Sequence, residues 1–264
     1  MRNESSASRR GQADVVDPVP GHKRGSTHMG SGSRRRVDWR QSNSASSQRL
    51  RRALIVVLLA GFVGVVVSVL GAQTGVEWAP QLSVGALWFV LLSASIYALV
   101  SAPARSLFAF RSSDLLWGVG LAVLLRLGGG LLAGANTLPF PTIPLEGMLD
   151  WVTMVVLPQG FLGPVVEEIY FRAVLTVVVY RLLRPLGRPL LAGLSAVFAS
   201  AGCFVLLHCA FAPLPAADAV MLLTLSVTCS SLVLMTGRIW GAVLTHIFYN
   251  VSYVALAAVG FLLA

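Results

Sequence analysis

The sequence predicts an all-α protein, a polytopic transmembrane helical bundle of about seven spans. Of its 264 residues, 56% are hydrophobic and 12% are charged, whereas soluble domains carry about 25% charged residues. Beyond residue 52, apolar stretches long enough for a bilayer span of about 20 residues follow one another along the chain. This pattern excludes a soluble domain held by one membrane anchor.

The first 52 residues differ in character from the rest. They carry twelve Lys and Arg against four Asp and Glu, are rich in Ser, Gly and Arg, and lack hydrophobic periodicity. Such a segment is expected to be disordered. It offers no folded basic face, so we expect no nucleic-acid partner. We predict that 1–52 is a disordered basic cytoplasmic tail, that it sets topology and attracts anionic lipid, and that its first 45 residues are dispensable for activity. The membrane-embedded bundle is predicted at 53–264.

Seven apolar segments are predicted to span the bilayer, at 53–72, 84–101, 115–135, 161–183, 189–212, 218–236 and 239–262. Asp114 and Asp218 stand where helix N-caps are expected. The proline-rich stretch 136–160 is predicted to be a loop with a short interfacial or half-inserted helix, and an eighth span there stays open. Gly130 and Gly134 predict close helix packing.

Arginine placement predicts the orientation. With a cytoplasmic N-terminus, the inner loops carry arginine and the outer loops carry only acidic residues, as the positive-inside rule requires. The inner residues are Arg105, Arg111, Arg181, Arg184, Arg188 and Arg238, and the outer ones are Glu77, Glu146 and Asp150. We expect a multi-pass protein of the cell membrane. Arg126 lies within the third span, where it is expected to have an ion-pair partner or a polar cavity.

Two adjacent glutamates lie in the fourth predicted span, where carboxylates are costly. Pro164 fits the first turn of a helix, and Glu167 and Glu168 follow it closely. Glu168 and Arg172 are four residues apart, so they share a helix face and can pair. Glu167 lies about 100° around the helix. We therefore assign Glu167 as a general base and Glu168–Arg172 as a supporting pair, the alternative being one charge network that contains both glutamates.

Two histidines and an asparagine follow in later spans. His246 and Asn250 share a helix face, so their N–H groups can donate two hydrogen bonds to one oxygen, as an oxyanion hole requires. His208 lies near the end of its helix, one turn after Phe204. A single membrane histidine is usually hydrogen-bonded packing. Together with the glutamate pair on successive helices, these residues predict a catalytic site.

Water is the predicted nucleophile, because no serine or cysteine has a well-placed base. Cys209 directly follows His208, and neighbouring residues do not face each other on a helix. We expect Glu167, helped by His208, to activate the water. A mechanism without a cofactor is favoured, and a Zn²⁺ site made of Glu167, His208 and His246 stays open.

The order of these motifs on hydrophobic helices resembles that of the CPBP family. Its members are intramembrane CAAX-protease and bacteriocin-processing enzymes, related to the eukaryotic type II CAAX prenyl endopeptidases. The motifs are Glu167-Glu168-x-x-x-Arg172, Phe204-x-x-x-His208 and His246-x-x-x-Asn250, and Thr236-Gly237-Arg238-Ile239-Trp240 is similar to the family's short turn before the last motif. The resemblance covers about residues 150–255, the expected catalytic core. It implies that Glu167 and His208 activate water while His246 and Asn250 stabilise the oxyanion.

The leading prediction is an intramembrane endopeptidase acting on a membrane-associated protein or peptide, with the lipid bilayer as its other partner. A non-enzymatic membrane adaptor or bacteriocin-immunity protein on the same scaffold is the alternative, and loss of a motif position would favour it. A proton-coupled transporter would also need buried carboxylates and histidines, but it predicts inverted repeats. We find no such repeat in the sequence.

Overall fold

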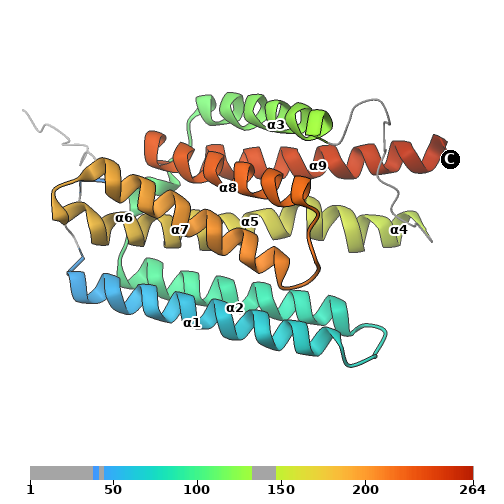
Figure 1. Ribbon diagram of the computed structural model, residues 1–264, viewed down its shortest axis with the longest axis horizontal. Coiled ribbons are helices and arrows are strands. Elements are labelled where there is room, and N and C mark those ends of the chain that lie inside the picture. Colours follow the sequence, from blue (N-terminus) through green and yellow to red (C-terminus); the bar gives the residue numbers. More distant parts are fainter. Residues whose placement is uncertain (1–37, 42–44, 133–146, 264) are drawn as a thin grey trace, which may run out of the picture. The chain divides into compact units, whose positions relative to one another are not determined.

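The computed structural model describes residues 38–41, 45–132 and 147–263, and every regular element within them is a helix. Figure 1 shows their course. The elements are α1 (Ser47–Ala72), α2 (Ala79–Ser101), η1 (Arg105–Phe108), α3 (Ser112–Leu132), α4 (Met148–Trp151), η2 (Val152–Leu162), α5 (Gly163–Glu168), η3 (Ile169–Thr176), α6 (Val177–Leu183), η4 (Arg184–Leu186), α7 (Pro189–Cys209), α8 (Ala216–Thr236) and α9 (Trp240–Leu263).

The all-α membrane architecture is confirmed. Six helices within the described ranges are long and apolar enough to cross a bilayer: α1, α2, α3, α7, α8 and α9. A further helix runs without a break over 148–183, through α4, η2, α5, η3 and α6. These six helices and the long helix 148–183 agree with the predicted number of about seven spans. The protein is a multi-pass membrane protein.

The long helix 148–183 begins earlier than the sequence suggested. The predicted loop 136–160 is helical from residue 148 onward, and its apolar run continues directly into the rod instead of forming a separate half-helix. Pro158 is accommodated because η2 has π-helical hydrogen bonding, in which each N–H bonds one residue further back than in an α-helix. The earlier part of that predicted loop lies outside the described residues.

The second half of the long helix is the centre of the fold. Every residue from Tyr170 to Val178 is buried, including the polar Arg172 and Thr176, so neighbouring helices surround this part of the helix on all sides. One of its faces packs with α1, α2 and α7 in a cluster that includes Phe171 and Phe204. Another packs with α3, α8 and α9 through Ala173 and Val177. Large apolar side chains on the outer helices stay exposed, as for Phe62 at 69%, and they suit a lipid environment.

Helix α3 packs on α9 at a glycine that the sequence did not single out. A Cβ atom on Gly118 would lie 2.5 Å from Leu244 Cβ, so only glycine allows this approach. The predicted contact at Gly130 is wrong, because open space surrounds its Cβ position, and Gly134 lies outside the described residues. Close packing at small residues is the usual source of helix association where lipid removes the hydrophobic driving force.

Arg126 on α3 also serves the contact with α9. Its guanidinium donates to Ser252 Oγ at 3.0 Å and to the Tyr249 carbonyl. The Arg126 Cζ atom lies 4.1 Å from the centroid of the Tyr249 ring, a cation–π distance. The contacts that hold Arg126 are thus a hydroxyl, a carbonyl and an aromatic face, where the sequence had suggested an ion pair or a polar cavity.

One end of the bundle is tied together by arginines and by the chain just before α1. Trp39 is 1% exposed, and its indole N–H donates to the Gly237 carbonyl at 2.8 Å. Arg40 donates to the carbonyls of Leu234 and Met235 at the end of α8, a usual arginine position. Helix α1 begins at Ser47 and not at 53. The folded part therefore includes residues within the tail that the sequence predicts, and positions 1–37 and 42–44 of that tail lie outside the described residues.

Asp114 and Asp218 lie in first helical turns, two residues after the helix begins, and not at the N-caps expected from the sequence. Asp114 accepts a hydrogen bond from the Arg111 backbone N–H at 2.9 Å, like the third residue of a capping box. It is fully buried and pairs with Arg238 NH2 at 2.7 Å. This pair joins the start of α3 to the turn between α8 and α9.

Candidate active site

The two glutamates lie at the end of α5, between two π-helical segments. Helix α5 is only six residues long, and η2 and η3 flank it. A π-helical turn leaves carbonyls with altered partners and is frequent at functional sites. The Phe171 carbonyl in η3, for example, accepts from Thr176 Oγ1 at 2.9 Å and from Ser200 Oγ at 3.0 Å. Side chains thus satisfy the irregular backbone around the glutamates.

Glu168 is the anchored member of the pair. It is fully buried, and its Oε1 lies 3.1 Å from Arg172 NH1 and 2.9 Å from His246 Nδ1. The contact between Glu168 and Arg172 that the spacing predicted is therefore present. The imidazole N–H of His246 donates to the same carboxylate oxygen, a contact between the long helix and α9 that the sequence did not indicate.

Arg172 is held by aromatic rings as well as by Glu168. Its Cζ lies 4.6 Å from the Phe204 ring centroid and 5.7 Å from that of Phe171, both within cation–π range. Its guanidinium nitrogens make no hydrogen bond within the described residues, so the contact with Glu168 is an ion pair without hydrogen-bond geometry. A buried cation with this little hydrogen bonding depends on its carboxylate.

Glu167 is the accessible member of the pair. Its side chain is 14% exposed, and its Oε2 lies 3.9 Å from His246 Nε2. That separation is too long for a direct hydrogen bond. Nearby, a Cβ atom on Gly163 would lie 3.7 Å from Glu167 Oε1 but only 3.1 Å from the Pro158 carbonyl oxygen and 3.1 Å from Trp88 Cζ2. Gly163 thus lets α2 and the π-helical turn pack closely beside the carboxylate.

His246 stands between the two glutamates and is almost completely buried. Its Nδ1 faces Glu168 and its Nε2 faces Glu167, each at the distance given above. Such a hydrogen bond on one ring nitrogen orients the ring and sets what the other nitrogen can do. With His246 neutral, Glu167, Glu168 and Arg172 together carry one net negative charge. A proton on both ring nitrogens makes the group neutral.

His208 approaches the same region from α7. Its Nδ1–H donates to the Phe204 carbonyl at 2.9 Å, which leaves Nε2 as the acceptor of a neutral imidazole. The Phe204 ring is fully buried between the two histidines, with its centroid 4.5 Å from that of His208 and 5.7 Å from that of His246. The Phe204 ring therefore contacts both imidazoles and the Arg172 guanidinium.

Asn250 lies one turn after His246 but makes a different contact. Its amide N–H donates to the Gln159 carbonyl at 2.8 Å. The sequence predicted that His246 and Asn250 aim at one oxygen, but here His246 binds Glu168 and Asn250 binds η2. One N–H of the Asn250 amide is left for another acceptor.

Gln159 is the site residue that sequence reasoning missed. It contributes a backbone carbonyl, which carries no side-chain signature. The only sign was the run of prolines and glycines around it, Pro158, Gly160, Gly163 and Pro164, which indicates irregular helical hydrogen bonding.

The site contains side chains of the types that bind zinc, namely glutamate and histidine. Zinc takes nitrogen, oxygen and sulfur ligands at about 2.0–2.3 Å, at least three of them from the protein. Within 38–41, 45–132 and 147–263, no group of three or more His, Cys, Asp or Glu side chains is arranged to hold a metal ion. The three candidates, Glu167, His208 and His246, do not form such a group.

Comparison with known proteins gives one family match. Residues 149–252 match the family described as type II CAAX prenyl endopeptidase Rce1-like. The matched segment contains all seven residues of the candidate site that the motifs indicated: Glu167, Glu168, Arg172, Phe204, His208, His246 and Asn250. No curated protein and no solved structure matched the chain.

Proposed function

Because residues 149–252 match the type II CAAX prenyl endopeptidase Rce1-like family, we propose that the protein is an intramembrane endopeptidase that cleaves a membrane-associated protein or peptide. One observation supports this most strongly, namely the unequal environment of the two glutamates. Glu168 is bound to Arg172 and His246, whereas Glu167 is partly exposed and lies beyond direct hydrogen-bond distance of His246 Nε2. A carboxylate that structural contacts leave free is the one that can accept a proton.

In the proposed first step, Glu167 takes a proton from water while the water oxygen attacks the scissile carbonyl. The 3.9 Å between Glu167 Oε2 and His246 Nε2 is a separation that a water molecule can bridge. His208 assists, because its Nε2 is available to accept a hydrogen bond from the same water. The attack forms one C–O bond and turns the carbonyl into a tetrahedral oxyanion.

Donors must then stabilise the negative oxygen, which is usually the largest single contribution to acyl transfer. His246 Nε2, when it carries a proton, and the remaining N–H of Asn250 supply two. In the second step the oxyanion collapses, the C–N bond breaks, and Glu167 returns its proton to the leaving amine.

The membrane orientation that we propose follows from the distribution of arginines along the chain. We place the N-terminus and the arginine-rich end in the cytoplasm of a cell whose plasma membrane holds the bundle. Fusions of a reporter that is active only outside the cytoplasm, made after Ala72 and after Ala102, test this. The expected result is activity for the first fusion alone. The reverse result would show the opposite orientation.

The test of function compares membrane peptides from cells that express wild type with those from cells that express Glu167→Gln. New peptide termini present only with wild type identify the substrate, and a synthetic peptide spanning that cleavage position then measures turnover. Glu77→Gln, an exposed glutamate between α1 and α2, is the matched control and should cleave normally. Loss of the general base is expected to reduce turnover about 10²–10⁴-fold. Identical peptide profiles for wild type and Glu167→Gln would instead favour the non-enzymatic adaptor.

A further inference from the structure

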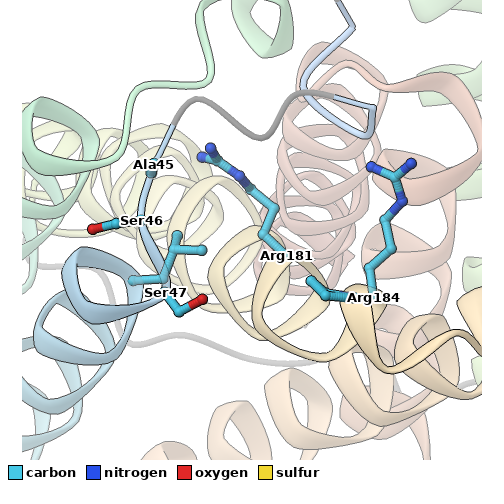
Figure 2. A pocket seen from close by; sticks show the side chains of 7 residues that line it. Ala45, Ser46, Ser47, Arg181 and Arg184 are labelled. Atoms are coloured by element: carbon cyan, nitrogen blue, oxygen red, sulfur yellow. The ribbon is translucent and has the colours of Figure 1, made fainter.

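The cavity at the arginine-rich end lies apart from the glutamates. It has a volume of about 420 Å³, and Figure 2 shows Arg181 and Arg184 beside it, opposite the start of α1. Arg181 follows Glu168 by thirteen residues on the same long helix, which at 1.5 Å per residue is roughly 20 Å. The cavity therefore does not border Glu167, and the walls of the substrate site are formed by other side chains.

Trp88 reaches Glu167 from a neighbouring helix, α2. A Cβ atom on Gly163 would lie 3.1 Å from Trp88 Cζ2 and 3.7 Å from Glu167 Oε1, so the indole and the carboxylate border the same point. The other carboxylate oxygen, Oε2, lies 3.9 Å from His246 Nε2. Glu167 therefore has the imidazole of His246 near one oxygen and the indole of Trp88 near the other.

The edge of the Trp88 indole that lies beside Gly163 is the edge that carries the N–H. Cζ2 and Nε1 are bonded to the same ring carbon, so both atoms lie on the same side of the indole. Within the described ranges, the indoles of Trp39 and Trp240 donate to carbonyls, whereas the N–H of Trp88 has no hydrogen-bond partner. The N–H of a tryptophan away from solvent usually has one. Trp88 is half-buried, so its donor is left for an external acceptor.

The position of Trp88 along α2 does not suit a membrane anchor. Tryptophan is enriched at the two surfaces of a bilayer, and Trp78, just before α2, is 61% exposed. Trp88 instead lies near the middle of Ala79–Ser101 and is half-buried, whereas its neighbour Phe89 is 73% exposed. At that depth an N–H without an acceptor is costly. A polar group of a ligand would remove this cost.

From these contacts we propose that Trp88 is a specificity-determining residue that contacts the substrate. The proposal rests on the proposed endopeptidase function. The oxyanion donors His246 and Asn250 hold the scissile carbonyl oxygen on one side of Glu167, so the adjoining residue of the peptide lies on the side of Trp88. The indole N–H donates to a backbone carbonyl there. The bulk of the ring leaves room for a small or medium apolar side chain and excludes a large one.

The first test measures the hydrogen bond. It uses the full-length protein in detergent and the peptide substrate that the comparison of wild type with Glu167→Gln identifies. Trp88→Phe keeps an aromatic ring and removes the N–H, which should raise KM about fivefold with little change in kcat, because the bond is the same in the ground and transition states. Trp117→Phe is the matched control, since it removes an indole N–H at a 49% exposed position on α3, and it should behave as wild type.

The second test measures the wall. Two peptides differ only in the residue next to the scissile bond, which is valine in one and phenylalanine in the other. Wild type should prefer valine, and Trp88→Ala should shift the ratio of the two kcat/KM values towards phenylalanine by about tenfold or more. This ratio does not depend on how much of the variant is folded. Phe89→Ala removes a neighbouring aromatic ring that is 73% exposed, and it should keep the wild-type ratio.

The outcomes separate the role of Trp88 from the function itself. Identical membrane-peptide profiles for wild type and Glu167→Gln would overturn both. Cleavage that Glu167→Gln abolishes, together with an unchanged KM in Trp88→Phe or an unchanged ratio in Trp88→Ala, would overturn the role of Trp88 alone. A change in Trp117→Phe or Phe89→Ala as large as in its Trp88 counterpart would do the same, because the effect would then not come from contact with the substrate.

Discussion

Separating Glu168 from Arg172 should destabilise the bundle more than removing both charges. Both side chains are 0% exposed, and Glu168 Oε1 lies 3.1 Å from Arg172 NH1. Removing one partner of a buried pair costs about 3–5 kcal/mol, because the remaining charge is uncompensated. In a protein of this size about 1 kcal/mol corresponds to 2–4 °C. Glu168→Gln and Arg172→Met should therefore each lower the melting temperature by roughly 6–20 °C.

The two single variants should not lower the melting temperature equally. After Arg172→Met, Glu168 still accepts a hydrogen bond from His246. After Glu168→Gln, the contacts that Arg172 keeps among the described residues are the faces of Phe204 and Phe171, and His246 loses the carboxylate that its Nδ1–H binds. We therefore expect Glu168→Gln to be the more damaging change. The double variant Glu168→Gln/Arg172→Met leaves no buried charge from the pair and should melt above both singles.

The assay is thermal unfolding of the purified protein in one detergent. Unfolding is measured as the decrease in the fraction of protein that remains monodisperse after heating. The four proteins form a double-mutant cycle that isolates the coupling between the two side chains. Glu77→Gln and Arg188→Gln, at exposed positions, control for loss of charge alone. Single variants that melt within about 1 °C of wild type, or a double variant whose loss is the sum of the singles, would refute the reasoning.

Three further predictions concern the chain before α1, metal and acid. Deleting 1–37 should leave the melting temperature unchanged, whereas deleting 1–41 removes Trp39 and Arg40 and should lower it. Equal melting of the two truncated proteins would contradict the anchoring role. Prolonged treatment with a membrane-permeant chelator should leave turnover unchanged, and loss restored by Zn²⁺ would show that a metal participates. Burial raises the pKa of Asp38, but hydrogen bonds from Arg40 and the charges of Arg40 and Arg184 outweigh it and keep that pKa below its ordinary value. The stabilising contribution of Asp38 is thus present above its unfolded pKa and is lost as pH falls through the folded pKa. Asp38→Asn should therefore flatten the fall in melting temperature below about pH 4, and an unchanged acid profile would show that Asp38 plays no part.

The sequence alone determined the features that depend on spacing within one helix. Apolar length predicted the membrane rods, because a bilayer requires about 20 residues whatever their neighbours. The four-residue spacing of Glu168 and Arg172 predicted their contact, since helix geometry places such residues on one face. The same rule put His246 and Asn250 on one side of α9. The rule does not predict which residues of other helices contact these two side chains.

The tertiary structure decided every contact between helices. His246 binds Glu168 across 78 positions of sequence, and Asn250 binds the Gln159 carbonyl across 91. Gln159 is available because η2 adopts π-helical hydrogen bonding, which the sequence signalled only through nearby prolines and glycines. Trp39 belongs to the folded part of the chain, because its indole N–H donates a hydrogen bond to the Gly237 carbonyl. Local composition carries no information about such distant partners. The unequal roles proposed for Glu167 and Glu168 therefore have two sources: helix periodicity separates the two side chains, and the packing of α9 and α7 around them decides what each one touches.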